Sequence, residues 1–403
     1  MIGKSRAPIH VNSIMYSRPK SRVVRRNQPN PSTPVANWQG CDFSVRQSKL
    51  RKVAENSHFR SKTPNVASRL RAHIIRPVPA VTLLIVAASG LVSIAVAWGV
   101  ASGRIPAPLA HPEARSLHAR PVPRTGGIAI WAGWLAGWAV AAQPDWALVG
   151  PLALVVGVSL VDDHKGLPPR VRILVHVAAA AAVSAFWLGA GGPFLVLEVL
   201  VIAWMANLYN FMDGADGLAG SMGVVGFGAL AFAAIQAGQA GLAIPLGALA
   251  IACGGFLVFN LPPARLFMGD VGAVGLGFAA GAFGLKGWTD GVWPWWFPPM
   301  VFLPFIFDAT VTLVRRMLKR APMAVAHRDH FYQQAILKRG RHAPTVAAYT
   351  GWMLLGAVAG LAALRWAPEI GGVLLVVLAA GFGGYCRTIV RRAPTPPDAS
   401  HAG

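Results

Sequence analysis

The stretch LVLEVLVIAWMANLYNFMDGADGLAGSMGVVGFGALAFAAIQA, residues 195–237, decides the fold. Two apolar runs, 195–210 and 218–237, flank a short segment that carries two aspartates and two glycines. About 20 apolar residues are needed for a helix to cross a bilayer. Long apolar runs without two-residue alternation favour helices over barrel strands. The stretch therefore predicts two transmembrane helices that are joined by a polar loop.

The same pattern repeats along the chain from about residue 80. The chain is 54% hydrophobic and only 13% charged, whereas soluble domains are roughly a quarter charged. The composition and the runs predict an all-α, polytopic integral membrane bundle of about eleven transmembrane helices. The runs lie near residues 80–101, 127–143, 146–161, 171–189, 195–210, 218–237, 241–259, 271–286, 296–314, 346–364 and 370–386.

Residues 1–76 have a different composition from the rest of the chain. They hold 16 Lys and Arg against Asp42 and Glu55, a net +14 of the chain's +22. High charge with few large apolar residues predicts a disordered basic tail. No aromatic interleaving or folded motif points to nucleic acid, so we expect no nucleic-acid partner. The remainder divides into a transmembrane domain over 77–392 and a disordered C-terminal tail over 393–403.

The basic residues beyond the tail predict the orientation of the helices. If the spans alternate, 19 Lys and Arg fall on one side and only Lys286 and Arg365 on the other. The positive-inside rule makes the side with 19 cytoplasmic. Eleven spans with a cytoplasmic C-terminus leave the +14 tail outside. We favour the interpretation that the working protein begins near residue 77; the alternatives are a tail that is translocated and a miscounted helix.

Acidic residues gather on the predicted cytoplasmic side. Asp162, Asp163, Asp213, Asp216 and Asp270 all fall at helix ends or in loops there. Carboxylates near lipid are costly unless they are paired or hold a cation, which makes them functional candidates. Hard oxygen ligands suit Mg²⁺ or Mn²⁺ together with substrate phosphates. The pattern predicts a metal site for a soluble, phosphate-bearing substrate.

Basic and histidine residues on the same side are candidates to meet phosphate. They include His118, Arg124 and Lys165. In HRDHFYQQ, residues 327–334, His327 and His330 would share a helical face if the segment is helical. Zinc is disfavoured because no cysteine or third histidine has suitable spacing.

Five motifs together resemble one enzyme family. They are RSLHARPVPRTGG (115–127), LVDDHKGLPPR (160–170), NLYNFMDGADGLAG (207–220), NLPPARLFMGDVG (260–272) and HRDHFYQQ. The chain resembles the polyprenyl-phosphate N-acetylhexosamine-1-phosphate transferases, glycosyltransferase family 4, over about residues 80–392. Its motif details look closest to the branch that starts O-antigen and related surface polysaccharides.

The resemblance implies a function. The family transfers a sugar 1-phosphate from a UDP-N-acetylhexosamine to undecaprenyl phosphate at the cytoplasmic face of the bacterial inner membrane and releases UMP. It implies Mg²⁺ as cofactor, with Mn²⁺ as an alternative, and a homodimer as one oligomeric state.

The resemblance also implies roles for single residues. It makes Asp270 and Asp163 metal ligands, and Asp162 or Asp163 the group that positions or deprotonates the lipid phosphate. The other implied contacts are Asn210, Asp213 and Asp216 to nucleotide and sugar, Asn260 and Phe267 to uridine, and His327 and His330 to the diphosphate.

One departure from the family pattern affects the start of the eighth span. Val271-Gly272-Ala273 follows Asp270, where relatives usually carry a serine in the third position. Loss of a helix-capping hydroxyl would cost roughly 1 kcal/mol.

Two other functions are weighed against this one. The first is the related phospho-N-acetylmuramoyl-pentapeptide transferase of peptidoglycan synthesis. The second is an ion-coupled transporter, for which intramembrane acids are also typical. Transporter acids would lie near the midplane, between matching halves of the chain.

Overall fold

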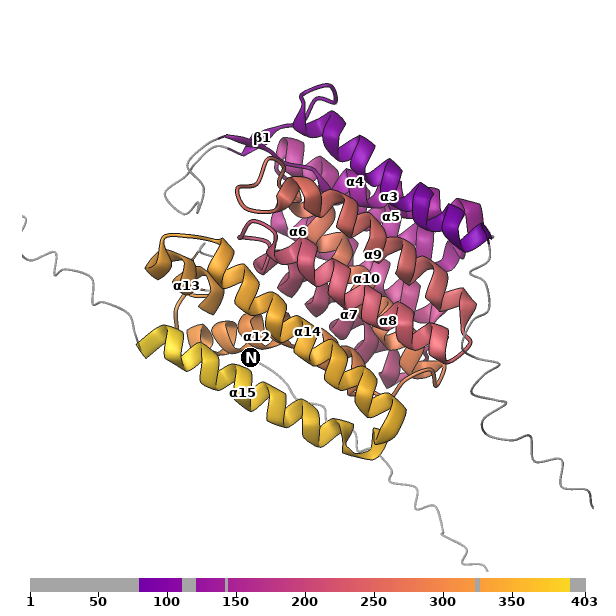
Figure 1. Cartoon of the computed structure of the whole chain (residues 1–403), viewed down its shortest axis with the longest axis vertical. Helices are drawn as coiled ribbons and strands as arrows, with labels where there is room; N and C mark the ends of the chain where they lie inside the picture. The colour runs from indigo at the N-terminus through magenta and orange to yellow at the C-terminus, as the bar shows by residue number, and fades with distance from the viewer. Residues whose placement is uncertain (1–79, 111–120, 142–143, 323–326, 392–403) are drawn as a thin grey trace, which may run out of the picture. The chain divides into compact units, whose positions relative to one another are not determined.

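The computed structural model describes residues 80–110, 121–141, 144–322 and 327–391, and the predicted tails at 1–76 and 393–403 lie outside these ranges. The described chain is almost entirely helical (Figure 1). Its helices are α3 (Ala80–Ala101), α4 (Gly127–Ala141), α5 (Trp146–Lys165), α6 (Pro169–Ala182), α7 (Pro193–Phe211), α8 (Leu218–Gln236), α9 (Ala240–Asn260), α10 (Gly269–Thr289), α11 (Phe297–Val301), α12 (Leu303–Leu318), α13 (Phe331–Arg339), α14 (Ala343–Trp366) and α15 (Gly371–Arg391).

This architecture confirms the predicted polytopic helical bundle. Within the described ranges, nine helices are long and apolar enough to cross a membrane. The second predicted run forms the shorter helix α4, and the ninth is divided between α11 and α12. Prolines occupy the first turns of both α11 and α12, where their missing N–H is tolerated. The fourth run ends in one π-helical turn, Val183–Trp187.

Helix α10 is the centre of the bundle. It packs against α4, α5, α7, α8 and α9, and nearly all of its residues are buried. A Cβ on Gly277 would lie 2.3 Å from the Met205 carbonyl oxygen of α7. Small residues let membrane helices approach this closely. The glycines of α10 therefore bring the end of α7 beside the start of α10.

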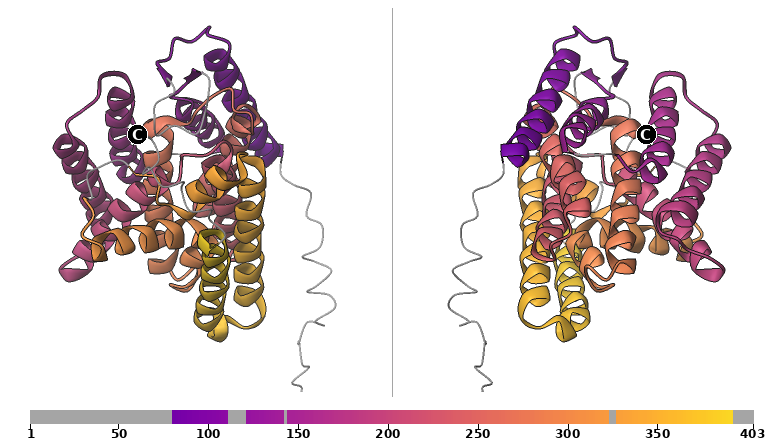
Figure 2. Two further views of the ribbon diagram at one scale, coloured as in Figure 1. Left: turned by 90° about the vertical axis from the view of Figure 1, so that its left-hand side faces the viewer. Right: turned by 90° about the vertical axis from the view of Figure 1, so that its right-hand side faces the viewer.

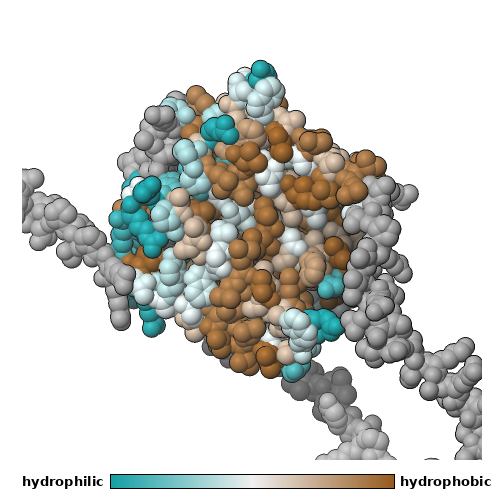
Figure 3. Space-filling model, in the orientation of Figure 1, coloured by the Kyte–Doolittle hydropathy of each residue, from teal (hydrophilic) through white to brown (hydrophobic). Residues whose placement is uncertain are grey.

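Polar residues gather at one end of the described helices. The ends of α5, α7 and α9 and the starts of α10 and α14 meet there, next to α13 and a two-stranded hairpin, β1 (Leu109–Ala110) with β2 (Val122–Pro123). In Figure 3, hydrophilic residues collect on the side where β1 and α13 lie in Figure 1, and the helices beyond are mostly hydrophobic. Figure 2 shows α14 and α15 packed as a pair on one flank.

Candidate active site

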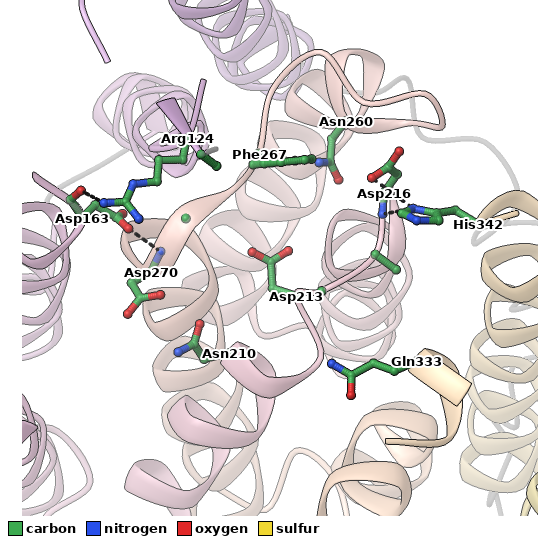
Figure 4. Close-up of a pocket in the computed structure, with 14 residues that line it drawn as sticks. Arg124, Asp163, Asn210, Asp213, Asp216, Asn260, Phe267, Asp270, Gln333 and His342 are labelled. Carbon is green, nitrogen blue, oxygen red and sulfur yellow. Dashed lines mark hydrogen bonds and ion pairs between the residues drawn. The ribbon is translucent and has the colours of Figure 1, made fainter. Parts of the chain in front are cut away.

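A pocket of about 320 Å³ opens among these helix ends (Figure 4). Eight of the predicted site residues line it, and they come from positions up to 146 residues apart in the sequence, Arg124 to Asp270. The eight are Arg124, Asp163, Asn210, Asp213, Asp216, Asn260, Phe267 and Asp270.

The loop between α7 and α8 forms one wall of the pocket. The chain turns at Gly217, which has φ of +81°, a left-handed conformation that glycine adopts without strain. At Gly214 a Cβ would lie 2.3 Å from the Tyr332 hydroxyl oxygen. That hydroxyl donates to the Phe211 carbonyl, over 2.9 Å. Glycine at 214 thus lets α13 hold the loop that carries Asp213.

Asp163 caps the N-terminus of α10. The Asp270 N–H donates to one carboxylate oxygen of Asp163 (3.2 Å), and the Val271 N–H donates to the other (3.0 Å). These are two of the N–H groups that lack a partner within the helix. The position where relatives carry a serine is the fully buried Ala273. A carboxylate from α5 therefore supplies a cap to α10.

Two arginines hold the acidic motif of α5 in place. Arg172 Nη1 lies 2.6 Å from Asp162 Oδ2 and 3.3 Å from Asp270 Oδ2, so it joins these two carboxylates. Arg124 Nη2 donates to the backbone carbonyl of Asp163. Backbone hydrogen bonds hold the segment that carries Arg124. The Phe267 N–H donates to the Pro123 carbonyl, and the Gly126 N–H donates to the Phe267 carbonyl.

The opposite side of the pocket is built around Asp216 and Asn260. Asp216 pairs with His342 Nδ1 at 3.1 Å and accepts the Ala264 N–H at 3.0 Å. The Asn260 side chain accepts the Gly217 N–H and donates to the Leu266 carbonyl. These bonds tie the α7–α8 loop to the α9–α10 loop. They also occupy part of the amide predicted to meet uracil.

The pocket is strongly acidic. Asp163, Asp213, Asp216 and Asp270 line it beside one arginine and one histidine, Arg124 and His342. Burial raises the pKa of Asp213 well above its usual range, and the carboxylates of Asp270, Asp163 and Asp216 raise it further. Like charges this close favour protonation or a bound cation.

The predicted histidines lie outside the pocket lining. Residues 327–330 are not helical, and His330 is the N-cap of α13. The two rings nevertheless stack, with centroids 5.1 Å apart. His330 Nδ1 lies 3.3 Å from the fully buried Asp308. Burial lowers the pKa of His327, as do the neighbouring His330 and Arg316.

Three further predicted residues have other surroundings. Asp162 pairs with Arg172 just beside the pocket, while Lys165 is exposed at the end of α5. Neither lines the pocket. His118 lies outside the described residues.

Sequence reasoning missed two polar pocket residues and, although it placed Arg172 on this side as a basic residue able to meet phosphate, it did not predict the bridge that Arg172 forms between two carboxylates. Gln333 and His342 line the pocket, and Arg172 joins Asp162 to Asp270. Gln333 lies inside the HRDHFYQQ motif, so the motif could have predicted it. His342 carries no such signal, because its partner Asp216 is 126 residues away.

The donor set fits a hard divalent cation. Four aspartate carboxylates line this pocket. Mg²⁺ commonly binds one or two protein carboxylates together with phosphate oxygens and water. Asp163 and Asp270 are adjacent, since the N–H of one residue bonds the carboxylate of the other. In the described part of the chain no three His, Cys, Asp or Glu side chains form a ready metal cluster.

Comparison with known proteins gives the chain a family. The model of glycosyl transferase family 4 matches residues 146–287, which include α5 to α10 and most of the pocket. A Bacillus subtilis (strain 168) protein described as a probable undecaprenyl-phosphate N-acetylglucosaminyl 1-phosphate transferase is 29% identical, over 55% of this chain and 68% of its own length.

Two other relatives are matched over shorter stretches. A phospho-N-acetylmuramoyl-pentapeptide-transferase of Pelotomaculum thermopropionicum is 34% identical over 40% of this chain and 61% of that protein. A decaprenyl-phosphate N-acetylglucosaminephosphotransferase of Mycobacterium leprae is 26% identical over 45% of this chain and 55% of that protein. The matched stretches thus cover between just over half and about two thirds of the length of each of these three relatives. The family model and these relatives support membership of glycosyl transferase family 4, the family that its motifs resemble.

Proposed function

We propose that this protein transfers an N-acetylhexosamine 1-phosphate from a UDP-sugar to undecaprenyl phosphate and releases UMP. An oxygen of the acceptor phosphate attacks the β-phosphorus of the donor, and the bond from that phosphorus to the bridging oxygen breaks. The product is a lipid diphosphate-sugar, which begins an O-antigen or related surface polysaccharide.

One observation carries this proposal: four carboxylates and an arginine line a pocket at the polar end of a bundle of apolar helices. Such a pocket repels a nucleoside diphosphate unless a cation balances it. It also lies where a phosphate attached to a membrane-embedded chain can reach it. A soluble anionic donor and a lipid acceptor meet at such a boundary.

The chain's own residues bind and orient the reactants. We assign Asp270 and Asp163 to the metal, and Asp162 with Asp163 to positioning or deprotonating the acceptor phosphate. When bound, Mg²⁺ supplies the positive charge that offsets repulsion between two phosphates and stabilises departing UMP.

Other residues hold the donor. Arg124 lines the pocket, and its Nε is buried with no acceptor among the described residues, so it would meet the diphosphate. Asn210, Asp213 and Asp216 would contact nucleotide and sugar, and the Phe267 ring would stack on uracil. Asn260 would act mainly through the two loops that it joins.

Several parts of the proposal concern groups beyond the pocket lining. His327, His330 and Lys165 would contact the diphosphate after the surrounding loops adjust, and His118 would do so from the segment before β2. The site would face the cytoplasm of a bacterial inner membrane. The enzyme would work as a monomer or homodimer.

The test is UMP release by the purified protein in detergent, with undecaprenyl phosphate, Mg²⁺ and a panel of UDP-N-acetylhexosamines. We expect turnover with one of these donors and its loss in EDTA. Asp162→Asn, Asp163→Asn and Asp270→Asn should each lower it by orders of magnitude while the protein still inserts. Wild-type turnover by these variants would refute the site.

The second candidate is a phospho-N-acetylmuramoyl-pentapeptide transferase, because a relative with 34% identity carries that description. The same assay with UDP-N-acetylmuramoyl-pentapeptide separates the two. Release of UMP from this donor alone would replace the proposed substrate.

A further inference from the structure

A second cavity, of about 800 Å³, lies between α12, α13 and α15. Phe307 and Val311 of α12 and Phe331 of α13 form one side of it. Residues of α15 from Val376 to Arg387 form the other side, and most of them are small or apolar. We refer to this cavity as the α15 groove.

Positive charge stands at one end of the α15 groove. Arg315, in the last turn of α12, and Arg387, near the end of α15, both line it, and no acidic residue does. Arg315 stacks over the Phe331 ring at 5.2 Å from its centroid. Both arginines come from the polar end of the bundle, and the residues before them on each helix are apolar. The groove is therefore cationic at the membrane surface and hydrophobic below it.

The length of the groove matches one leaflet. Val376 and Arg387 are 11 positions apart on a continuous helix, which corresponds to roughly 16 Å at about 1.5 Å per residue. The hydrocarbon core of one leaflet is about 15 Å thick, half of the bilayer core. An acyl chain whose head group meets the arginines would thus run along the groove to about the middle of the membrane.

Small residues keep the groove open. Ala379, Ala380, Gly383 and Gly384 line its α15 side. A Cβ built on Gly384 would meet nothing within 4 Å. Longer side chains at these positions would fill the space. At Gly383 a Cβ would instead lie 2.9 Å from the Phe307 ring, so the open part of the α15 surface is the part around Gly384.

Helix α13 separates the α15 groove from the acidic pocket. Phe331 lines the groove and Gln333 lines the pocket, and no residue lines both. Residues two positions apart in an α-helix are rotated by about 200° around the helix axis, so the side chains of Phe331 and Gln333 leave opposite faces of α13. A molecule in the groove would not reach the carboxylates, but would pack against the helix that contributes Gln333 and Tyr332 to the site.

We propose that the α15 groove binds an anionic glycerophospholipid, distinct from the polyprenyl acceptor. The two guanidinium groups recognise the net negative charge of its head group, which carries no choline cation to balance the phosphodiester, and the apolar wall takes one acyl chain. A membrane surface that contains anionic lipids attracts each nearby arginine by about 1 kcal/mol, and the groove adds apolar burial. The bound lipid supports α13 from the side that faces away from the pocket.

Lipid binding can be measured without turnover, so the outcome is independent of the proposed transfer reaction. Delipidated protein is titrated with phosphatidylglycerol or phosphatidylcholine of the same acyl chains, and bound lipids are counted by native mass spectrometry. We expect the wild type to retain phosphatidylglycerol at least tenfold better. Gly384→Phe, which fills the groove, and the double variant Arg315→Gln/Arg387→Gln should remove that preference.

Matched controls lie outside the groove. Gly351 on α14 also has open space around it, so Gly351→Phe adds the same ring elsewhere. Lys319→Gln removes a cation from the exposed end of α12, away from the groove lining. Both should bind phosphatidylglycerol like the wild type. Unchanged binding in Gly384→Phe and in the double arginine variant would overturn the proposal.

Wild-type protein supplies a test that does not depend on variant folding. Phosphatidylglycerol with a photoreactive acyl chain should label peptides from one or both walls of the groove, Phe307–Arg315 and Val376–Arg387. Labelling elsewhere only would contradict the proposal. So would competition by undecaprenyl phosphate at equal concentration, because the groove would then belong to the acceptor.

Discussion

At the residue scale, Asp163 and Asp270 are neighbours with different surroundings. Asp163 is buried and accepts two N–H groups of α10, whereas the partner of the Asp270 carboxylate is Arg172. Asp163→Asn keeps one acceptor oxygen but leaves one of the two N–H groups without an acceptor, which should cost about 1–3 kcal/mol. Asp270→Asn removes a like charge and should leave stability in EDTA unchanged or higher.

Thermal unfolding in detergent with EDTA separates these two residues, although both variants should lose activity. Equal midpoints for Asp163→Asn and the wild type would show that the cap contributes nothing. A large fall in Asp270→Asn would show that its pairing with Arg172 outweighs the repulsion.

Asp213 gives the pocket a pH dependence. Its pKa is raised in the folded protein by burial and by neighbouring carboxylates, while an unfolded aspartate titrates near 3.9. The folded state therefore binds the proton more tightly. Its contribution to stability is fully present below the unfolded pKa and is lost as pH rises through the folded pKa.

Asp213→Asn removes this titration, so the variant should lose less thermal stability than the wild type between about pH 4 and pH 8. Unfolding midpoints in metal-free buffer across this range check the expectation. Parallel curves for the two proteins would mean that Asp213 titrates as an ordinary aspartate.

The sequence predicted the acids of the pocket better than their partners. Acidic residues stand out in an apolar chain, and helix alternation placed them on one side without coordinates. The pairing of Arg172 with Asp270 and of His342 with Asp216 depends on which helix ends meet. That information is in the packing of α5, α10 and α14, not in local sequence.

At the scale of elements, Asp308 of α12 anchors the start of α13. It is fully buried and accepts the N–H groups of Phe331 and Tyr332 and the hydroxyl of Tyr349, the last at 2.6 Å. Tyr349→Phe removes one donor to this carboxylate and should cost about 1.5–3 kcal/mol. Amide hydrogen exchange at Phe331 and Tyr332 should become faster.

Thr310 supplies the control for this substitution. Its hydroxyl oxygen is also buried on α12 but has no hydrogen-bond partner in the described ranges. Thr310→Val should therefore leave stability and exchange nearly unchanged. Protection of Phe331 and Tyr332 that survives in Tyr349→Phe would show that the Tyr349 hydroxyl does not help to hold α13.

The contact of α7 with α10 sets the distance between Asn210 and Asp270. A Cβ at Gly277 would lie 2.3 Å from the Met205 oxygen and 2.7 Å from the Ala206 Cα. Gly277→Ala must push these backbones apart, at a cost of about 1–3 kcal/mol. We expect a lower unfolding midpoint together with reduced UMP release.

Gly228 on α8 is the matched position, because its Cβ would meet only the Ala250 methyl at 4.0 Å. Gly228→Ala should be neutral or stabilise by up to about 1 kcal/mol through helix propensity. If both alanine variants behave alike, the close approach of α7 and α10 is unimportant.

Hydropathy predicted the helices well and their interruptions poorly. The predicted apolar runs correspond to helices in the structure. Length and apolar composition predict such helices because the bilayer imposes both. The division between α11 and α12 was hidden within one run, although Pro298, Pro299 and Pro304 were visible in it. The β1–β2 hairpin has two residues per strand, too few for any periodic signal.

At the scale of the whole molecule, the basic residues that orient membrane helices lie at the same end of the bundle as the acidic pocket. Arg124, Arg172 and Arg315 lie at the end where the four carboxylates meet. Among the described turns at the opposite end, the only lysine and arginine are Lys286 and Arg365. The positive-inside rule orients such a bundle with its basic end in the cytoplasm. The donor nucleotide of the proposed reaction is cytoplasmic, which requires the same orientation.

Cysteine labelling tests this orientation directly. Lys319 is exposed at the basic end and Gln239 is exposed at the other, and the described native cysteines, Cys253 and Cys386, are buried. A membrane-impermeant maleimide added to spheroplasts should label Gln239→Cys and spare Lys319→Cys. Inverted vesicles should give the opposite pattern. If spheroplasts label Lys319→Cys, the acidic pocket faces away from cytoplasmic nucleotide, and the transfer reaction proposed for it has no donor.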